Sequence, residues 1–178
     1  MNKHSRFILH GFKLAVVVLA ICGAGSAMAA TATASSTTTV VTPIAVSKAA
    51  DLSFGNIAGG GSAGTVTLSP NGSRAATGGA VTAGGTATAA QFNVTGQSGL
   101  TYAIDFSGTS ATLTSGANTM TFTAISDTTA SAITSGTATT GTLTGGAQTI
   151  YVGGTLAVGA NQVAGTYSGT INVAVNYN

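Results

Sequence analysis

From residue 31 onward, apolar side chains alternate with small polar ones and do not recur every three or four residues. Phe92 and Val94 share one face of such a run, and Tyr102, Ile104 and Phe106 share one face of another. Successive side chains of a strand point to opposite faces, and the β-branched residues Thr and Val favour strands. The pattern therefore predicts strands with one apolar face and one face of Thr, Ser and Asn. No segment has helical spacing, so we expect an all-β fold.

Glycine pairs and triplets separate these runs. Strands are predicted at 40–46, 65–69, 86–95, 100–106, 119–125, 149–152, 155–158 and 166–177. Glycines at 59–61, 78–79, 84–85, 145–146 and 153–154, and Asn71-Gly72, are predicted to form turns, because glycine adopts positive φ without steric cost. Short strands with turn signals between them are typical of a sandwich or a closed barrel.

The first 29 residues differ from the remainder. A basic stretch ends at Lys13, an apolar run follows at 14–21, and Ala27-Met28-Ala29 provides the small residues that signal peptidase accepts. The run is shorter than the roughly 20 residues that span a bilayer. We predict a signal peptide cleaved after Ala29. A lipoprotein signal using Cys22 is the alternative, which the bulky Ile21 before it disfavours.

Residues 30–178 contain no Cys, His, Glu or Trp. Their charged side chains are Lys48, Asp51, Arg74, Asp105 and Asp127, which give a net charge of −1. This charge does not favour a nucleic-acid partner. Zinc sites need Cys or His, and a Ser nucleophile needs a base such as His. We therefore predict no enzyme, no cofactor, no metal and no small-molecule substrate.

The C-terminal stretch, residues 165–178, is the most regular strand pattern in the chain. Ile171, Val173, Val175 and Tyr177 fall on one face, with Thr, Asn and Ala on the other. This pattern alone fits an ordinary closing strand of a sandwich.

Two short motifs link the chain to known exported proteins. The penultimate Tyr177 and Gly165, fourteen positions from the end, match the C-terminal strand of chaperone–usher pilins, which this stretch resembles. The stretch from Leu52 through Phe54 and Gly55 resembles the L-x-F-G opening of the spore coat protein U domain and of a related uncharacterised family of exported bacterial proteins. The chain differs from the common pilin pattern because it lacks the Cys pair.

The resemblance implies an immunoglobulin-like β-sandwich that lacks one strand. The apolar groove beside the C-terminal strand would then be filled by strand addition from a neighbour's N-terminal arm. The assembly residues on the C-terminal strand would be Gly165, Ile171, Val173, Val175 and Tyr177. Those on the arm, residues 30–46, would be Thr38, Val40, Thr42, Ile44 and Val46. Pro43 interrupts this arm, so residues 40–46 are alternatively the domain's own first strand, which leaves residues 30–39 as the donor.

The expected organisation is a signal peptide at 1–29, the arm at 30–46 and the sandwich at 47–178. The resemblance implies a structural subunit of a fibre (fimbrium) or coat on the surface of a Gram-negative bacterium, exported through the periplasm. Its partners would be copies of itself or related subunits, a periplasmic chaperone and an outer-membrane usher. The alternative is a self-contained secreted sandwich that binds a glycan or a host surface, which would need an exposed aromatic cluster.

Overall fold

The computed structural model describes residues 28–178. Residues 28–38 carry no helix or strand and are exposed, and Thr39–Asn178 is a separate compact unit. The predicted signal peptide, residues 1–29, lies outside the described residues except for Met28 and Ala29.

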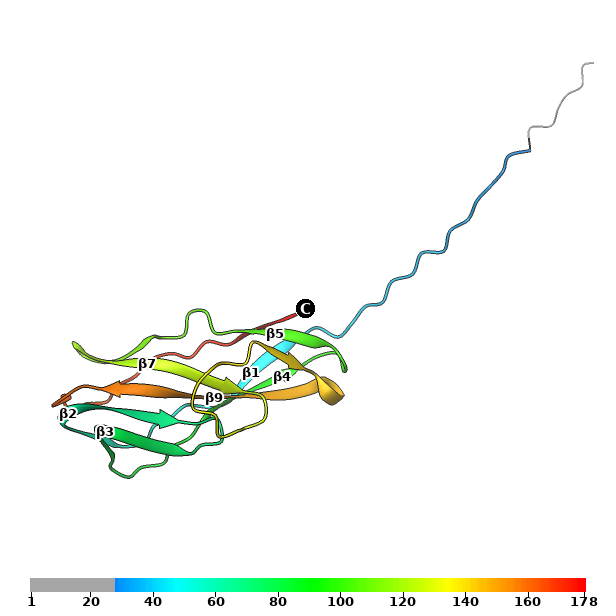
Figure 1. Cartoon of the computed structure of the whole chain (residues 1–178). Coiled ribbons are helices and arrows are strands. Elements are labelled where there is room, and N and C mark those ends of the chain that lie inside the picture. Colours follow the sequence, from blue (N-terminus) through cyan, green and yellow to red (C-terminus); the bar gives the residue numbers. More distant parts are fainter. Residues whose placement is uncertain (1–27) are drawn as a thin grey trace, which may run out of the picture. The chain divides into compact units, whose positions relative to one another are not determined.

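The described residues are strands, connecting segments and a single 3-10 turn, as the alternating pattern predicted (Figure 1). None of their helices is long and apolar enough to cross a membrane. The elements are β1 (Ala45–Ala50), β2 (Ile57–Leu68), β3 (Arg74–Thr82), β4 (Ala90–Thr95), β5 (Thr101–Asp105), β6 (Thr112–Ser115), β7 (Asn118–Asp127), β8 (Thr140–Thr142), the 3-10 turn η1 (Thr144–Gly146), β9 (Ala147–Val158) and β10 (Ala174–Tyr177).

Strand β9 pairs with three other strands of the larger sheet, which has seven strands. Its residues 147–152 pair with β4, and its residues 154–158 pair with β2. Strand β7 pairs with residues 151–157 of β9. The sheet continues from β4 to β1, from β2 to β3 and from β7 to β6, and every pair is antiparallel. The edges beyond β4, β2 and β7 are therefore β1, β3 and β6.

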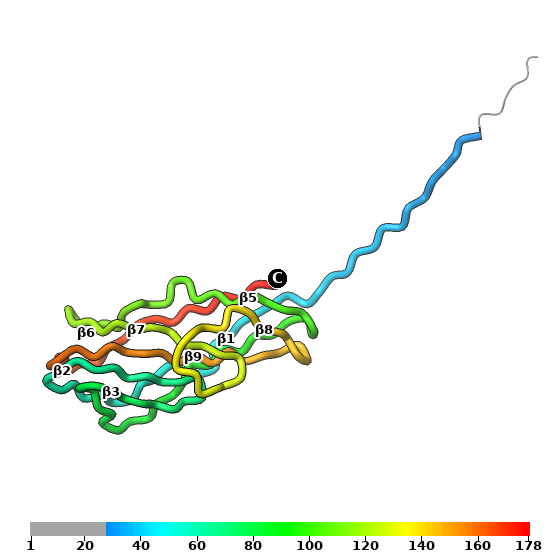
Figure 2. Tube along the Cα trace, in the orientation of Figure 1, coloured from blue at the N-terminus to red at the C-terminus, as the bar shows by residue number. Residues whose placement is uncertain are grey.

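The smaller sheet has three strands in the order β10-β5-β8. Both pairs are antiparallel, and Tyr177 lies opposite Tyr102. Figure 2 shows the C-terminal segment, residues 165–178 (red), running from the end of β9 to the side of β5. The two antiparallel sheets form a β-sandwich, which confirms the predicted fold class.

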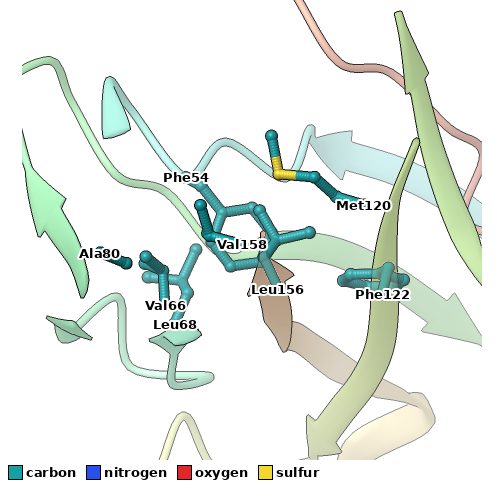
Figure 3. Packing of buried hydrophobic residues seen from close by; sticks show 8 residues of the cluster. All are labelled: Phe54, Val66, Leu68, Ala80, Met120, Phe122, Leu156 and Val158. Atoms are coloured by element: carbon teal, nitrogen blue, oxygen red, sulfur yellow. The ribbon is translucent and has the colours of Figure 1, made fainter. Parts of the chain in front are cut away.

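One half of the core contains side chains from β2, β3, β7 and β9 and from Phe54. Phe54 contacts Phe122 edge to face, with ring centroids 6.2 Å apart and an interplanar angle of 83°. This geometry is favoured by the quadrupoles of the two rings. Figure 3 shows these side chains pointing toward one another. The cluster consists of Phe54, Val66, Leu68, Ala80, Met120, Phe122, Leu156 and Val158.

The other half of the core joins the two sheets. Tyr102 of β5 is fully buried, and its hydroxyl donates to Gln148 Oε1 at 2.8 Å, so its polar end is satisfied. Burial raises the pKa of this phenol. The predicted shared faces of Phe92 with Val94 and of Tyr102 with Ile104 are confirmed, because all four side chains are buried. The cluster consists of Ala90, Phe92, Val94, Tyr102, Ile104, Leu143, Ile150 and Val152.

Several predicted turns are wrong because their glycines lie inside strands. The glycines at 59–61 belong to β2, those at 78–79 to β3 and those at 153–154 to β9. A Cβ on Gly153 would overlap the carbonyl of Leu68, and one on Gly154 would overlap the ring of Phe122. Glycine is needed in β9 for close packing between neighbouring elements and not for positive φ.

Several predicted strands also have different bounds. The strand predicted at 40–46 is β1, which begins at Ala45. The regular strand predicted at 166–177 is shorter, since only Ala174–Tyr177 forms a ladder and Ser168 makes an isolated bridge to Thr114. The runs at 149–152 and 155–158 are one strand, β9. Strands β3, β6 and β8 were not predicted. Strand β3 consists mainly of small residues and β6 and β8 are short, so apolar and polar residues alternate only weakly in them.

Candidate functional site: an open groove beside the C-terminal segment

The charged side chains of the described residues are scattered and locally bound. Lys48 Nζ lies 2.6 Å from Asp51 Oδ1 in an exposed ion pair. The carboxylate of Asp105 accepts hydrogen bonds from the backbone and hydroxyl of Ser107. Among residues 28–178, no three His, Cys, Asp or Glu side chains gather as metal ligands would. The features that suggest function are instead backbone edges and an apolar groove.

The C-terminal segment carries the predicted apolar face. Ile171, Val173, Val175 and Tyr177 are half-buried and pack against the cluster that contains Tyr102. Gly165, the fifth predicted assembly residue, is exposed, and a Cβ there would meet Ser115 Oγ. The structure thus brings four of the five predicted residues onto one surface of the core, with Gly165 at the start of the segment.

The backbone hydrogen bonds of this segment use only one edge. Ser168 exchanges hydrogen bonds with Thr114 at 2.9 and 3.0 Å, and the carbonyl of Thr170 accepts from Ser110 at 2.8 Å. Farther along, the N–H of Asn178 donates to Thr101 on β5 at 3.4 Å. The even-numbered residues therefore point their backbone groups toward β5 and the segment that follows it.

The odd-numbered residues point the other way. Within residues 28–178, the backbone groups of Gly169, Ile171 and Val173 have no hydrogen-bond partner. Strand β10 pairs with β5 alone, so the C-terminal segment is an edge of its sheet. Unpaired N–H and C=O groups in a row are a template for another strand.

A second unpaired edge faces this one across the groove. Ser53 exchanges hydrogen bonds of 2.8 Å with Thr88, away from the groove. The residues before and after Ser53 point their backbone groups to the opposite side. Within the described residues, neither Leu52 nor the N–H of Phe54 has a hydrogen-bond partner. We call residues 51–56 the opening segment. Leu52 and Phe54 direct their side chains toward the core, and the backbone groups of Leu52 and the N–H of Phe54 face the groove. The backbone groups of Asn56 instead pair with Ala83 and Gly84.

The groove between these two segments has a volume of about 1030 Å³. Leu52 and Phe54 line one wall, and Tyr167 and Ile171 line the other. The floor consists of apolar side chains of the core clusters, and all of them except the half-buried Leu113 are at most 9% exposed. The floor residues are Phe92, Leu113, Met120, Phe122, Leu156 and Val158.

Arg74 holds the opening segment in place. Its guanidinium donates to the carbonyls of Phe54, Asn56 and Gly84. Gly55 has a φ of 65°, and a Cβ there would overlap the guanidinium of Arg74. This contact gives the L-x-F-G motif a physical reason, because Leu52 and Phe54 point inward and Gly55 leaves room for Arg74. Sequence analysis did not assign Arg74 to the groove, since a lone Arg carries no signal of the carbonyls it binds.

The predicted donor residues fall into three groups. Ile44 and Val46 pack against the core of their own domain, and Val46 lies on β1. Thr42 is tied to the domain, since its carbonyl accepts from the Tyr177 hydroxyl at 2.7 Å. Val40 is 92% exposed and Thr38 is exposed. Thr42, Ile44 and Val46 are therefore bound to their own domain, whereas the side chain of Val40 is exposed.

Comparison with known proteins gave one family. No curated protein and no solved structure matches the chain. A family model described as "Domain of unknown function (DUF4402)" matches residues 44–177. These residues include β1 through β10, both walls and the floor of the groove. Because the match covers most of the sequence, this chain belongs to the DUF4402 family.

Proposed function

We propose that the protein is a structural subunit of a bacterial surface fibre or coat that assembles by β-strand addition. The observation that carries the proposal is the groove, whose two walls present unpaired backbone groups above an apolar floor. An extended segment placed in it would form hydrogen bonds with Leu52 and the N–H of Phe54 on one side and with Gly169, Ile171 and Val173 on the other. Its alternate side chains would cover the floor.

The donor in this proposal is the arm of a second copy, residues 30–41. Ile44 and Val46 are already used in the core of their own domain, so the donor must lie upstream of them. Residues 30–41 belong to no strand, and their Thr and Val residues favour the extended conformation. Thr38 and Val40 would point into the groove.

The proposed export and partners follow from the resemblance to chaperone–usher pilins. A subunit with unpaired backbone edges on both sides of a groove is prone to pair with other chains, so it needs a cover before assembly. A periplasmic chaperone and an outer-membrane usher would supply that cover, and the predicted signal peptide at 1–29 would direct export. A glycan-binding module would need exposed aromatic rings, whereas every Phe and Tyr of residues 28–178 is buried or half-buried.

Thermal unfolding of a self-fused chain tests strand addition. The chain 30–178 is compared with the same chain carrying a second copy of residues 30–41 after Asn178, through a flexible linker of about ten residues. We expect the midpoint to rise by at least about 5 °C, because each kcal/mol shifts it by roughly 2–4 °C in a domain of this size. Aggregation should fall at the same time.

The matched control carries Thr38→Asp and Val40→Asp in the appended copy only. Buried carboxylates are costly, so this control should unfold at the midpoint of the unfused chain. An equal midpoint for all three proteins, each a stable monomer, would exclude strand addition by the arm. That result would favour the self-contained binding module.

A further inference from the structure

The floor of the groove is a closed surface. A groove shaped to take large side chains would leave the side chains of its floor well exposed when it is open. The floor residues are instead packed against one another, and those at most 9% exposed are Phe92, Met120, Phe122, Leu156 and Val158. The side chains of a donor strand would therefore lie on the floor and not enter deep pockets in it.

Side chains of the two walls converge over this floor. Leu52 of the opening segment and Ile171 of the C-terminal segment each pack against both core clusters. The ring of Phe54, also on the opening segment, contacts that of Phe122 on the floor. The inward side chains of a donor strand must therefore fit between side chains that the walls already place there.

The volume of the groove leads to the same limit. Its volume of about 1030 Å³ is spread along a wall of twelve residues, 48–59, which is roughly 86 Å³ per residue, or the share of about three water molecules in the liquid. A main-chain unit with a small side chain fills such a space. The ring of a Phe needs more room than this.

Hydrogen bonds hold both walls in place. The Tyr167 hydroxyl accepts from Gln162 Nε2 at 2.7 Å and donates to the carbonyl of Val163 at 2.7 Å. On the other wall, the guanidinium of Arg74 binds two carbonyls of the opening segment. The walls would have to break these hydrogen bonds to move apart, so the groove does not widen freely for a large side chain.

The arm meets this size limit at every position. Residues 30–41 are Ala, Ser, Thr and Val only, so no side chain among them is larger than that of Val. We propose that the groove selects its donor strand by size: it accepts segments whose inward side chains are no larger than Val and rejects large ones such as Phe. The inference rests on the proposed function and names the class of partner, an extended segment of small side chains, which the arm of a second copy provides. Backbone hydrogen bonds then supply most of the affinity.

Peptide binding tests this size limit. The protein is the chain 30–178, and fluorescence anisotropy follows three fluorescein-labelled peptides: the natural peptide of residues 30–41, a Phe peptide and a Val peptide. Inward side chains recur at every second residue, so substitutions at every third residue place one of them inward in each window of five residues, whatever the register. The Phe peptide carries Ala32→Phe, Ser35→Phe, Thr38→Phe and Val41→Phe, and the matched Val peptide carries Ala32→Val, Ser35→Val and Thr38→Val.

Val and Phe both favour strands, so the two variant peptides differ in side-chain size and apolar area. We expect the Val peptide to bind within about threefold of the natural peptide or more tightly, and the Phe peptide to bind at least about tenfold more weakly than the Val peptide, because overpacking is costly. Burial of apolar area alone predicts the opposite order. A Phe peptide that binds as tightly as the Val peptide, or more tightly, would overturn the inference. Absence of binding by all three peptides would instead refute strand addition by the arm.

Discussion

At the residue scale, the absence of a side chain matters as much as its presence. Gly153 and Gly154 lie where β9 changes partner from β4 to β2, and neither leaves space for a Cβ. Gly96 and Gly55 make room for the Tyr177 phenol and the Arg74 guanidinium. Each glycine thus admits one group that shapes the core, the groove or the base of the arm.

Gly154→Ala should destabilise the domain through overpacking. The added methyl group would overlap the Phe122 ring, and insertion of a methyl group into a packed core costs about 1–3 kcal/mol. The midpoint of urea unfolding measures this change. Gly61→Ala is the matched control, because no atom lies within 4 Å of a Cβ at that position. Equal stability of the two variants would contradict the packing role of Gly154.

At the element scale, the C-terminal segment both completes the core and leaves one backbone edge unpaired, because its residues alternate in direction. Its odd-numbered side chains complete the core, and the backbone groups of the same residues face the groove. Its even-numbered residues bind β5 and residues 109–114. A strand can thus contribute to stability while its edge remains available to a partner.

Amide hydrogen exchange should reveal this alternation directly. In the free chain 30–178, the amides of Gly169, Ile171 and Val173 should exchange quickly, whereas those of Ser168 and Ala174 should be protected. Saturation with the peptide of residues 30–41 should slow the three fast amides. NMR on nitrogen-15-labelled protein measures both states. Uniform protection of all five amides in the free chain would show that the groove edge already has a partner.

At the scale of the whole molecule, stability depends little on charge. Residues 30–178 have five charged side chains, and Lys48 and Asp51 pair with each other at the surface. Hydrogen bonds from the side chain and backbone of Ser107 lower the pKa of Asp105. The nearby hydroxyls of Ser131 and Thr129 lower the pKa of Asp127. Of these two hydroxyls, only that of Thr129 makes a hydrogen bond of ordinary geometry to the carboxylate, at 2.8 Å. We therefore assign the lowering of this pKa mainly to Thr129.

The unfolding midpoint of chain 30–178 should therefore be flat between about pH 5 and 9, a range that contains no Asp, Tyr or Lys reference pKa. Because the two aspartate pKa values are lower in the folded state, their stabilisation is present above the unfolded value and is lost as pH falls below about 4. The raised pKa of Tyr102 stabilises below about pH 10 and is lost above it. Calorimetry across this range checks both limits. A steep change of the unfolding midpoint with pH near pH 7 would contradict this prediction.

The sequence alone was sufficient to assign several core side chains to their shared faces. A period of two places Phe92 with Val94 and Ile171 with Val173 whatever their neighbours are, because the alternation is a property of the extended backbone itself. The all-β class and the apolar face of the C-terminal segment are local consequences of this kind.

Only the tertiary structure decided which strand edges are paired. A glycine pair in a sequence fits either a turn or a close contact, and the neighbour that distinguishes them, such as Leu68 beside Gly153, is distant in the chain. The same holds for the groove: its opening segment and C-terminal segment are more than a hundred residues apart. The Tyr177 hydroxyl binds the carbonyl of Thr42, 135 residues away, and Arg74 binds carbonyls 10 to 20 residues away, so no pattern within one strand specifies these hydrogen bonds. Side-chain direction is set within a strand, whereas an unpaired edge exists only relative to the rest of the fold.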